Sequence, residues 1–145
     1  MSKPIKYMAW DKQYKKISKV NMILFSTNEI DVDDNLGEPK SMDHYELMEF
    51  TGLCDKNQKE IYEGYLCKYY SKNGVIIGVI EWEKQAGAFW LKWNEKSESG
   101  RVFHRYKELK ATFSDGEIFM IENLEVIGHK YENTNEYSFT LKYKI

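Results

Sequence analysis

The chain has little proline, little cysteine and no long apolar run. It contains 2 Pro among 145 residues, so few positions interrupt backbone hydrogen bonding. Its two cysteines, Cys54 and Cys67, lack the spacing of a disulfide framework or a zinc site, which favours two reduced thiols. No segment approaches the roughly 18 apolar residues of a transmembrane helix. Residues 1–19 show no apolar stretch typical of a signal peptide. These absences predict a cytoplasmic protein without a membrane partner.

The net charge is small and the aromatic content is high. The formal charge is -2 and aromatics make up 15% of the chain, with 11 Tyr. Disordered chains have few aromatics and a large net charge, so a folded protein is expected. A chain of this length is typical of one domain with its own core. The balanced charge does not favour strong attraction to nucleic acid or to an anionic membrane.

The charge is nevertheless distributed unevenly. Residues 1–28 have six Lys against one acid, Asp11, whereas residues 29–49 have eight acids against Lys40. These oppositely charged segments could lie against each other, within a chain or between copies. Two solvated surfaces are the simpler interpretation.

Motifs for catalysis or metal binding are missing. His44, His104 and His129 are far apart and have no zinc-ligand spacing. Asp31-x-Asp33-x-Asn35 begins like a calcium loop, but Leu36 and Met42 stand where that loop needs Gly and Glu. No phosphate-binding loop or nucleophile motif is present. We therefore expect no enzymatic activity, no cofactor and no metal.

Strand and turn signals dominate the pattern. Asn73-Gly74 and Asp115-Gly116 each separate β-prone runs and predict hairpin turns. Residues 75–82 are apolar on both faces at their start, which predicts a central, fully covered strand with a bulge or bend at Gly78. Ala86-Gly87 then predicts a turn into a strand at 88–93, and these segments form a three-stranded meander typical of an SH3-like barrel.

Other segments give weaker or different signals. Residues 137–145 alternate apolar and polar side chains, as a half-buried strand does. Residues 5–10 and 15–20 could pair as a hairpin, and 44–50 is ambiguous but could be a strand. Residues 101–111 could form about two helical turns. Loops are expected at 28–42 and 94–100.

Three separated blocks resemble the YopX family of phage and prophage proteins. The most specific block is Thr51-Gly52-Leu53-Cys54-Asp55-Lys56-Asn57-Gln58-Lys59-Glu60-Ile61-Tyr62-Glu63-Gly64. The others are Ile5-Lys6-Tyr7-Met8-Ala9-Trp10-Asp11 and Glu125-Val126-Ile127-Gly128-His129-Lys130-Tyr131-Glu132-Asn133. The chain departs from the family pattern at Met8, at Gln58 in place of a turn Gly, at Tyr65 and at Thr134.

The resemblance implies a fold but no established activity. It implies a mostly β, or β-rich α+β, structure with an SH3-like small barrel and additional N- and C-terminal strands. We expect a single YopX-like domain over 1–145, in which strands 1–50 pack on a barrel segment at about 51–133, followed by a strand at 136–145. The signature residues, with a structural or interaction role, are Trp10, Thr51, Gly52, Leu53, Asp55, Asn57, Glu60, Ile61, Tyr62, Glu63, Gly64, Gly128, Tyr131, Glu132 and Asn133.

Two groups within these segments could carry chemistry. Asp55 to Gln58 reads as a tight turn, and Glu60 and Glu63 would face opposite sides of a strand, unlike a paired-carboxylate site. The tryptophans at 82, 90 and 93 lie near Lys84, Lys92 and Lys96, as in binders of single-stranded nucleic acid. Nearby glutamates offset that charge, which favours a core or subunit-interface role for the tryptophans.

The sequence thus predicts a non-enzymatic phage or prophage protein in the cytoplasm of a bacterial host. It would act through protein contacts, as a homo-oligomer and with a phage or host protein as a possible partner. The alternative is a nucleic-acid-binding accessory protein that uses the barrel surface.

Overall fold

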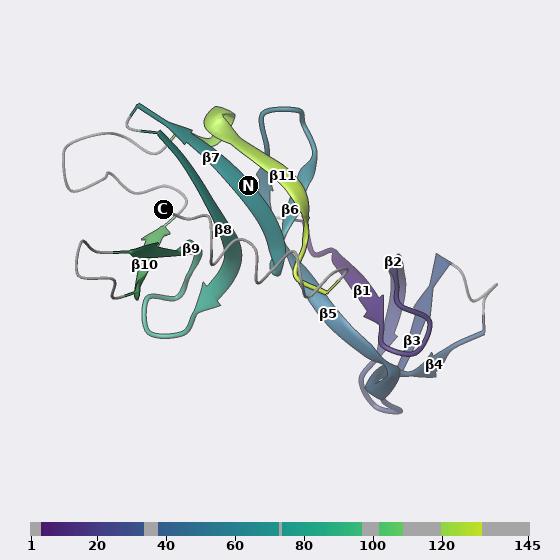
Figure 1. Cartoon of the computed structure of the whole chain (residues 1–145). Helices are drawn as coiled ribbons and strands as arrows, with labels where there is room; N and C mark the ends of the chain where they lie inside the picture. The colour runs from purple at the N-terminus through teal and green to yellow at the C-terminus, as the bar shows by residue number, and fades with distance from the viewer. Residues whose placement is uncertain (1–3, 34–37, 73, 97–101, 109–119, 132–145) are drawn as a thin grey trace. The chain divides into compact units, whose positions relative to one another are not determined.

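The computed structural model describes residues 4–33, 38–72, 74–96, 102–108 and 120–131 (Figure 1). The chain divides into two compact units, residues 1–50 and 51–145. Regular structure in the described ranges consists of antiparallel strands and short 3-10 turns, so the expected mostly β fold is confirmed. The expectation that both units form one domain stays a prediction.

The first unit is a curved antiparallel sheet with the strand order β4-β3-β2-β1-β5. Asp11 pairs with Lys16 across the first turn, which confirms the hairpin expected at 5–20. Residues 44–50 do form a strand, as part of the long β5. The strands are β1 (Tyr7–Asp11), β2 (Lys16–Leu24), β3 (Glu29–Val32), β4 (Lys40–Ser41) and β5 (Tyr45–Cys54), of which the last four residues belong to the second unit.

One face of this sheet forms the core of the first unit. Ala9, Ile30, Val32 and Tyr45 are each no more than 6% exposed and pack together. They come from β1, β3 and β5. Side chains alternate between the two faces of a strand, so Ile30 and Val32, two positions apart in β3, point to the same face. A register shift between Val20 and Met22 in β2 brings Val20 and Ile23 to the same face, where both pack against this core.

The prediction of a loop at 28–42 is wrong, because this segment contains the strands β3 and β4. Buried Ile30 and Val32 alternate with the more exposed Glu29 and Asp31. This period-2 pattern is a strand signal, but it is only four residues long. The basic and acidic segments are neighbouring strands of one sheet, since β3 pairs with β2 and β5 pairs with β1. The ion pair between Lys12 Nζ and Glu46 Oε1, at 3.8 Å, is half exposed and contributes little stability.

The second unit contains a five-stranded antiparallel sheet with the order β10-β9-β8-β7-β11. Figure 1 shows β7 and β8 as long, strongly bent strands. The 3-10 turns of the two units are η2 (Met42–His44) and η3 (Ile121–Asn123). The strands of the second unit are β6 (Glu60–Tyr62), which neighbours β5, β7 (Tyr65–Ser71), β8 (Gly74–Glu83), β9 (Ala88–Lys96), β10 (Val102–Glu108) and β11 (Leu124–His129).

The predicted meander is present in β7, β8 and β9. Ser71 pairs with Gly74 and Glu83 with Ala88, so tight hairpins join the three strands. Gly87 has a φ of 64°, which glycine adopts without strain, at the predicted Ala86-Gly87 turn. The inner face of the sheet is a dense core of side chains no more than 1% exposed: Cys67, Tyr69, Ile80, Leu91 and Leu124. Strand order and bending are consistent with the expected SH3-like barrel, and closure of that barrel stays a prediction.

The prediction for β8 is correct about its central place and about a bend (Figure 1), and it is wrong about full coverage at the start of the strand. Full coverage holds for Gly78, Val79 and Ile80, whereas Val75 is 52% exposed. Gly78 sits in a continuous β7–β8 register rather than at a bulge. A Cβ on this residue would collide with the carbonyl oxygen of Lys92 on β9, so close approach of two backbones explains the glycine.

Two predictions for the following segment are wrong. Residues 102–108 are the strand β10 and not a helix, because they pair along β9 from Val102 opposite Lys96 to Glu108 opposite Trp90. The same pairing extends β9 through residues 94–96, which were expected to be a loop. The turn at Asp115-Gly116 and the strand at 136–145 lie outside the described residues.

Candidate functional site

The signature block is centred on the buried carboxylate of Asp55. This side chain is 3% exposed, and its Oδ1 accepts backbone N–H bonds from Asn57 at 2.8 Å and Lys59 at 2.9 Å. The predicted turn is therefore confirmed. Its other oxygen, Oδ2, accepts from the backbone N–H of Val126 in β11 at 2.8 Å. Asp55 thus closes a local turn and joins it to a strand far away in the sequence.

The residues before this turn shape the end of β5. Thr51 Oγ1 donates to the carbonyl of Ile61 at 2.8 Å and accepts from the backbone N–H of Leu53 at 3.2 Å. Gly52, between them, has a φ of 91°, where other residues are strained. Ile61 is fully buried. These contacts give the Thr-Gly-Leu part of the signature a structural role.

The two signature glutamates have separate partners. Glu60 Oε1 accepts from the hydroxyl of Tyr62 at 3.0 Å. Glu63 Oε2 accepts from the backbone N–H of Trp82 in β8 at 3.2 Å. Burial, followed by the hydrogen bond to Glu60, raises the pKa of the Tyr62 hydroxyl. Each glutamate therefore supports a different strand.

Gly64 and Gly128 adopt positive φ values next to β7. Gly64 has a φ of 92°, donates its N–H to Ile80 at 2.7 Å and accepts at its carbonyl from Lys130 at 2.8 Å. Gly128 has a φ of 157° and follows a register shift in β11. Beside these glycines the rings of Tyr62, Tyr65, His129 and Tyr131 form a chain, with successive centroids 5.4, 6.4 and 6.5 Å apart.

The remaining signature residues are spread over the chain. Trp10 is 6% exposed and belongs to the first unit. Leu53 is half-buried and Asn57 is exposed. Glu132 and Asn133 lie outside the described residues. The structure thus brings together the signature residues of β5, β6 and β11 around Asp55 and Gly64 as a packing node. The distant partners of Asp55 and Glu63 have no signal in the sequence, because both are backbone amides, which every residue except proline carries.

The outer face of the five-stranded sheet presents an exposed patch that sequence reasoning missed. Tyr70 and Val75 pair across β7 and β8 and are 36% and 52% exposed. The ammonium groups of Lys56 and Lys68 lie 4.8 and 5.8 Å from the centroid of the Tyr70 ring. Its hydroxyl donates to Glu125 Oε1 at 2.8 Å, and this hydrogen bond raises the pKa of Tyr70. We call these five residues the outer patch.

The tryptophan region is mixed. Trp82 is 45% exposed and its ring meets Phe89 edge to face at 4.9 Å. Trp90 and Trp93 are half-buried. Lys92 Nζ lies 3.6 Å from Glu81 Oε2, so its charge is offset locally, as expected from the sequence. Trp82 is therefore the most accessible of these three tryptophans.

The two thiols are free and differently placed. Cys54 is half-buried, whereas Cys67 is fully buried and burial raises its pKa. Among the residues that the structure describes, no group of three or more His, Cys, Asp or Glu side chains could hold a metal ion. The same part of the chain contains no helix long and apolar enough to cross a membrane.

Comparisons with known proteins identify the class of the protein. The chain matches the family model described as YopX protein over residues 6–136, and it therefore belongs to the YopX family. Among solved structures it is similar to protein EF1440 from Enterococcus faecalis, with a TM-score of 0.51 and 23% identity over 93% of this chain and 99% of that chain. This likeness shows a common fold. No curated protein matches the chain.

Proposed function

We propose that this YopX protein is a phage- or prophage-encoded binding protein without enzymatic activity, which acts through protein contacts and self-association. The outer patch is the observation that carries the proposal. Val75 and Tyr70 expose apolar surface side by side on two paired strands of the five-stranded sheet. Contiguous exposed apolar surface is a feature of interaction sites, and paired strands need little ordering on binding.

The engagement of the signature carboxylates supports a non-enzymatic role. Asp55 accepts three backbone hydrogen bonds, and Glu60 and Glu63 accept bonds from Tyr62 and from the backbone of Trp82. A carboxylate that acts as a general base must lie within hydrogen-bond reach of the substrate proton that it removes. These three acids instead stabilise turns and strands.

Light scattering across a dilution series tests self-association through the outer patch. We expect the wild-type mass to fall on dilution, and the Val75→Lys variant to stay monomeric at concentrations where the wild type associates, because a charge would be buried at the contact. Phe25→Ser is the matched control, since Phe25 is 80% exposed in the first unit. A monomeric wild type throughout the series would contradict self-association. Equal masses for wild type and Val75→Lys would contradict the outer patch as its site.

Binding to nucleic acid is the second candidate, and exposed Trp82 beside the Lys84 turn favours it. Exposed rings next to lysines can stack on bases. Affinity capture from an induced host, with and without nuclease, separates the two candidates. A protein partner that survives nuclease supports the protein-contact role. Recovery that depends on nucleic acid, and that is lost in Trp82→Ala, would instead support the alternative.

A further inference from the structure

The first unit contains a pocket of about 220 Å³ at the end of its sheet, where β1 turns into β2. Its buried lining residues are Asp11, Ser18, Val32 and Tyr45, which are all no more than 7% exposed, and we call them its floor. Its rim is formed by exposed side chains from the turn after β1, from β2 and from β4: Tyr14, Lys16 and Lys40. A concave site in which a few buried polar groups lie beside apolar and aromatic side chains is a candidate small-molecule site.

The pocket is preformed by hydrogen bonds of its own floor. Asp11 Oδ1 accepts the backbone N–H groups of Gln13 and Tyr14, both at 2.9 Å, and these bonds fix the turn that supplies the Tyr14 ring. The backbone N–H of Lys15 also donates to the Asp11 carbonyl at 2.9 Å. A ligand would therefore meet an ordered turn and would not have to organise it on binding.

The charges of the pocket indicate the chemistry of its ligand. Lys40 Nζ stands 5.9 Å from the centroid of the Tyr14 ring, so a positive charge lies at the mouth beside an aromatic face. Lys16 adds a second ammonium group to the rim. Among the residues that the structure describes, Asp11 supplies the one carboxylate of the lining, and its Oδ1 accepts two backbone N–H bonds. The rim thus attracts an anion, while the floor offers oxygen atoms that accept hydrogen bonds.

We propose that this pocket binds a small organic anion that also carries hydroxyl or ammonium groups. The acidic group would lie between Lys16 and Lys40, and the hydrogen-bond donors would reach Asp11, Ser18 and Tyr45. The volume is below the roughly 300–1,000 Å³ of pockets for drug-sized ligands. A sugar phosphate or an amino acid matches this size and chemistry. The proposal is independent of the outer patch, which lies in the other unit.

Titration of the full chain, followed by backbone amide NMR, tests the pocket. The probes are glucose 6-phosphate and L-glutamate, which combine both kinds of group, and inorganic phosphate and glucose, which supply one each. We expect saturable shifts of the Ser18 and Tyr45 signals with at least one combined probe, at lower concentration than with phosphate or glucose. No saturable shift with either combined probe, or equal effects of phosphate alone, would overturn the proposal.

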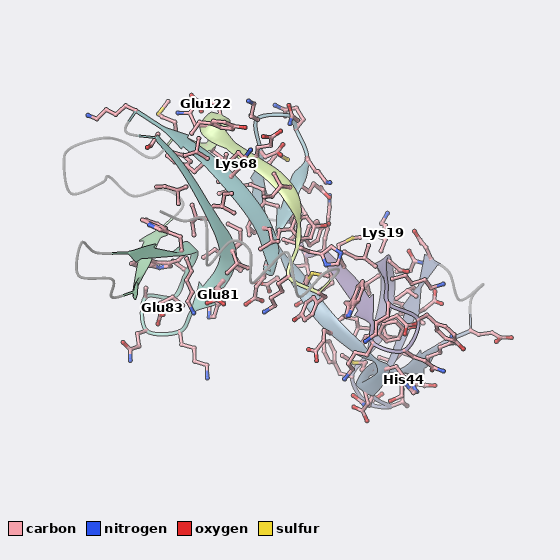
Figure 2. All side chains as sticks on the ribbon, viewed as in Figure 1. Lys19, His44, Lys68, Glu81, Glu83 and Glu122 are labelled. Atoms are coloured by element: carbon pink, nitrogen blue, oxygen red, sulfur yellow. The ribbon has the colours of Figure 1, made fainter. Side chains whose placement is uncertain are left out.

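Lysine variants show whether binding uses the rim. Lys40→Gln and Lys16→Ala should each weaken binding of the effective probe about tenfold, because each removes a charge-assisted contact. Lys19→Ala is the matched control. Lys19, labelled in Figure 2, is an exposed lysine of the same strand as Lys16, and its position in the register places it on the other face of that strand. Wild-type affinity in the control is expected. Equal losses in Lys19→Ala and Lys16→Ala would overturn the assignment. The amide spectra of each variant report its folding directly.

Discussion

Gln58 adopts a backbone conformation that suits glycine better. Its φ is 66°, in the turn that Asp55 closes, at the position where the resemblance to the YopX signature implies a turn glycine. A residue with a Cβ in this region costs about 1–2 kcal/mol, whereas glycine costs about 0.5–1 kcal/mol in conformational entropy. The chain therefore stores a small strain at an exposed residue.

Gln58→Gly should stabilise the protein by about 0.5–1 kcal/mol, because relief of strain exceeds the added entropy of the unfolded chain. Urea unfolding measures the change. Asn57→Gly is the control: Asn57 is exposed in the same turn and has no positive φ, so this substitution should be neutral or destabilising. A loss of stability in Gln58→Gly would contradict the strain argument.

Asp55→Ala should destabilise the protein by about 3 kcal/mol or more. The substitution removes one acceptor that serves three backbone N–H groups, and a buried donor without a partner costs about 1–3 kcal/mol. Chemical denaturation gives the magnitude. Asp33→Ala, at an exposed aspartate of the first unit, should change stability by less than about 0.5 kcal/mol. Similar effects of the two substitutions would contradict the central role of Asp55.

At the scale of elements, close packing of β8 against β9 depends on one missing side chain. A Cβ at Gly78 would overlap the carbonyl oxygen of Lys92 and would lie 3.1 Å from Cδ1 of Leu91. Backbone atoms in a paired strand cannot move aside without loss of ladder hydrogen bonds. The bend of β8 and the burial of the core around Ile80 both depend on this approach.

Gly78→Ala should therefore cost about 2–3 kcal/mol, as expected for overpacking of a core. Thermal or urea unfolding provides the measurement. Gly87→Ala is the matched control, since nothing lies within 4 Å of its added Cβ. Its φ of 64° alone should cost about 1 kcal/mol. The packing argument fails if Gly78→Ala is the milder of the two substitutions.

The sequence predicted elements with local signals and missed those that depend on distant partners. The β1–β2 hairpin, the Ala86-Gly87 turn and the Asp55 turn are visible locally, because turn residues and alternation lie within a few positions. Residues 102–108 have apolar groups at helical spacing, and their pairing along β9 decided the strand. The bond from Val126 to Asp55 spans 71 residues, and the pocket of the first unit combines residues of five strands, so neither was visible in the sequence.

At the scale of the whole molecule, we expect one cooperative unfolding transition. The first unit comprises only residues 1–50, and chains of about 60 residues or fewer bury too little surface to be more than marginally stable. Strand β5 continues through the boundary between Phe50 and Thr51, so loss of one unit removes part of a strand of the other.

Differential scanning calorimetry measures this cooperativity. The calorimetric enthalpy should equal the van't Hoff enthalpy and be about 100 kcal/mol for a chain of this length. Two resolved transitions would contradict the expectation and would show that the units unfold independently. The control is the Asp55→Ala variant, in which a single transition should move to lower temperature as a whole.

The hydrogen bonds of Asp55 also have a consequence for mutational drift. Its three donors are main-chain amides at positions 57, 59 and 126, and any residue except proline supplies such an amide. Descendants of this gene are therefore free to exchange the side chains at those positions without losing the node, provided that proline is avoided. The same exchange at Asp55 removes every bond at once. We expect a sequence record in which one invariant acid is surrounded by partners that change from lineage to lineage.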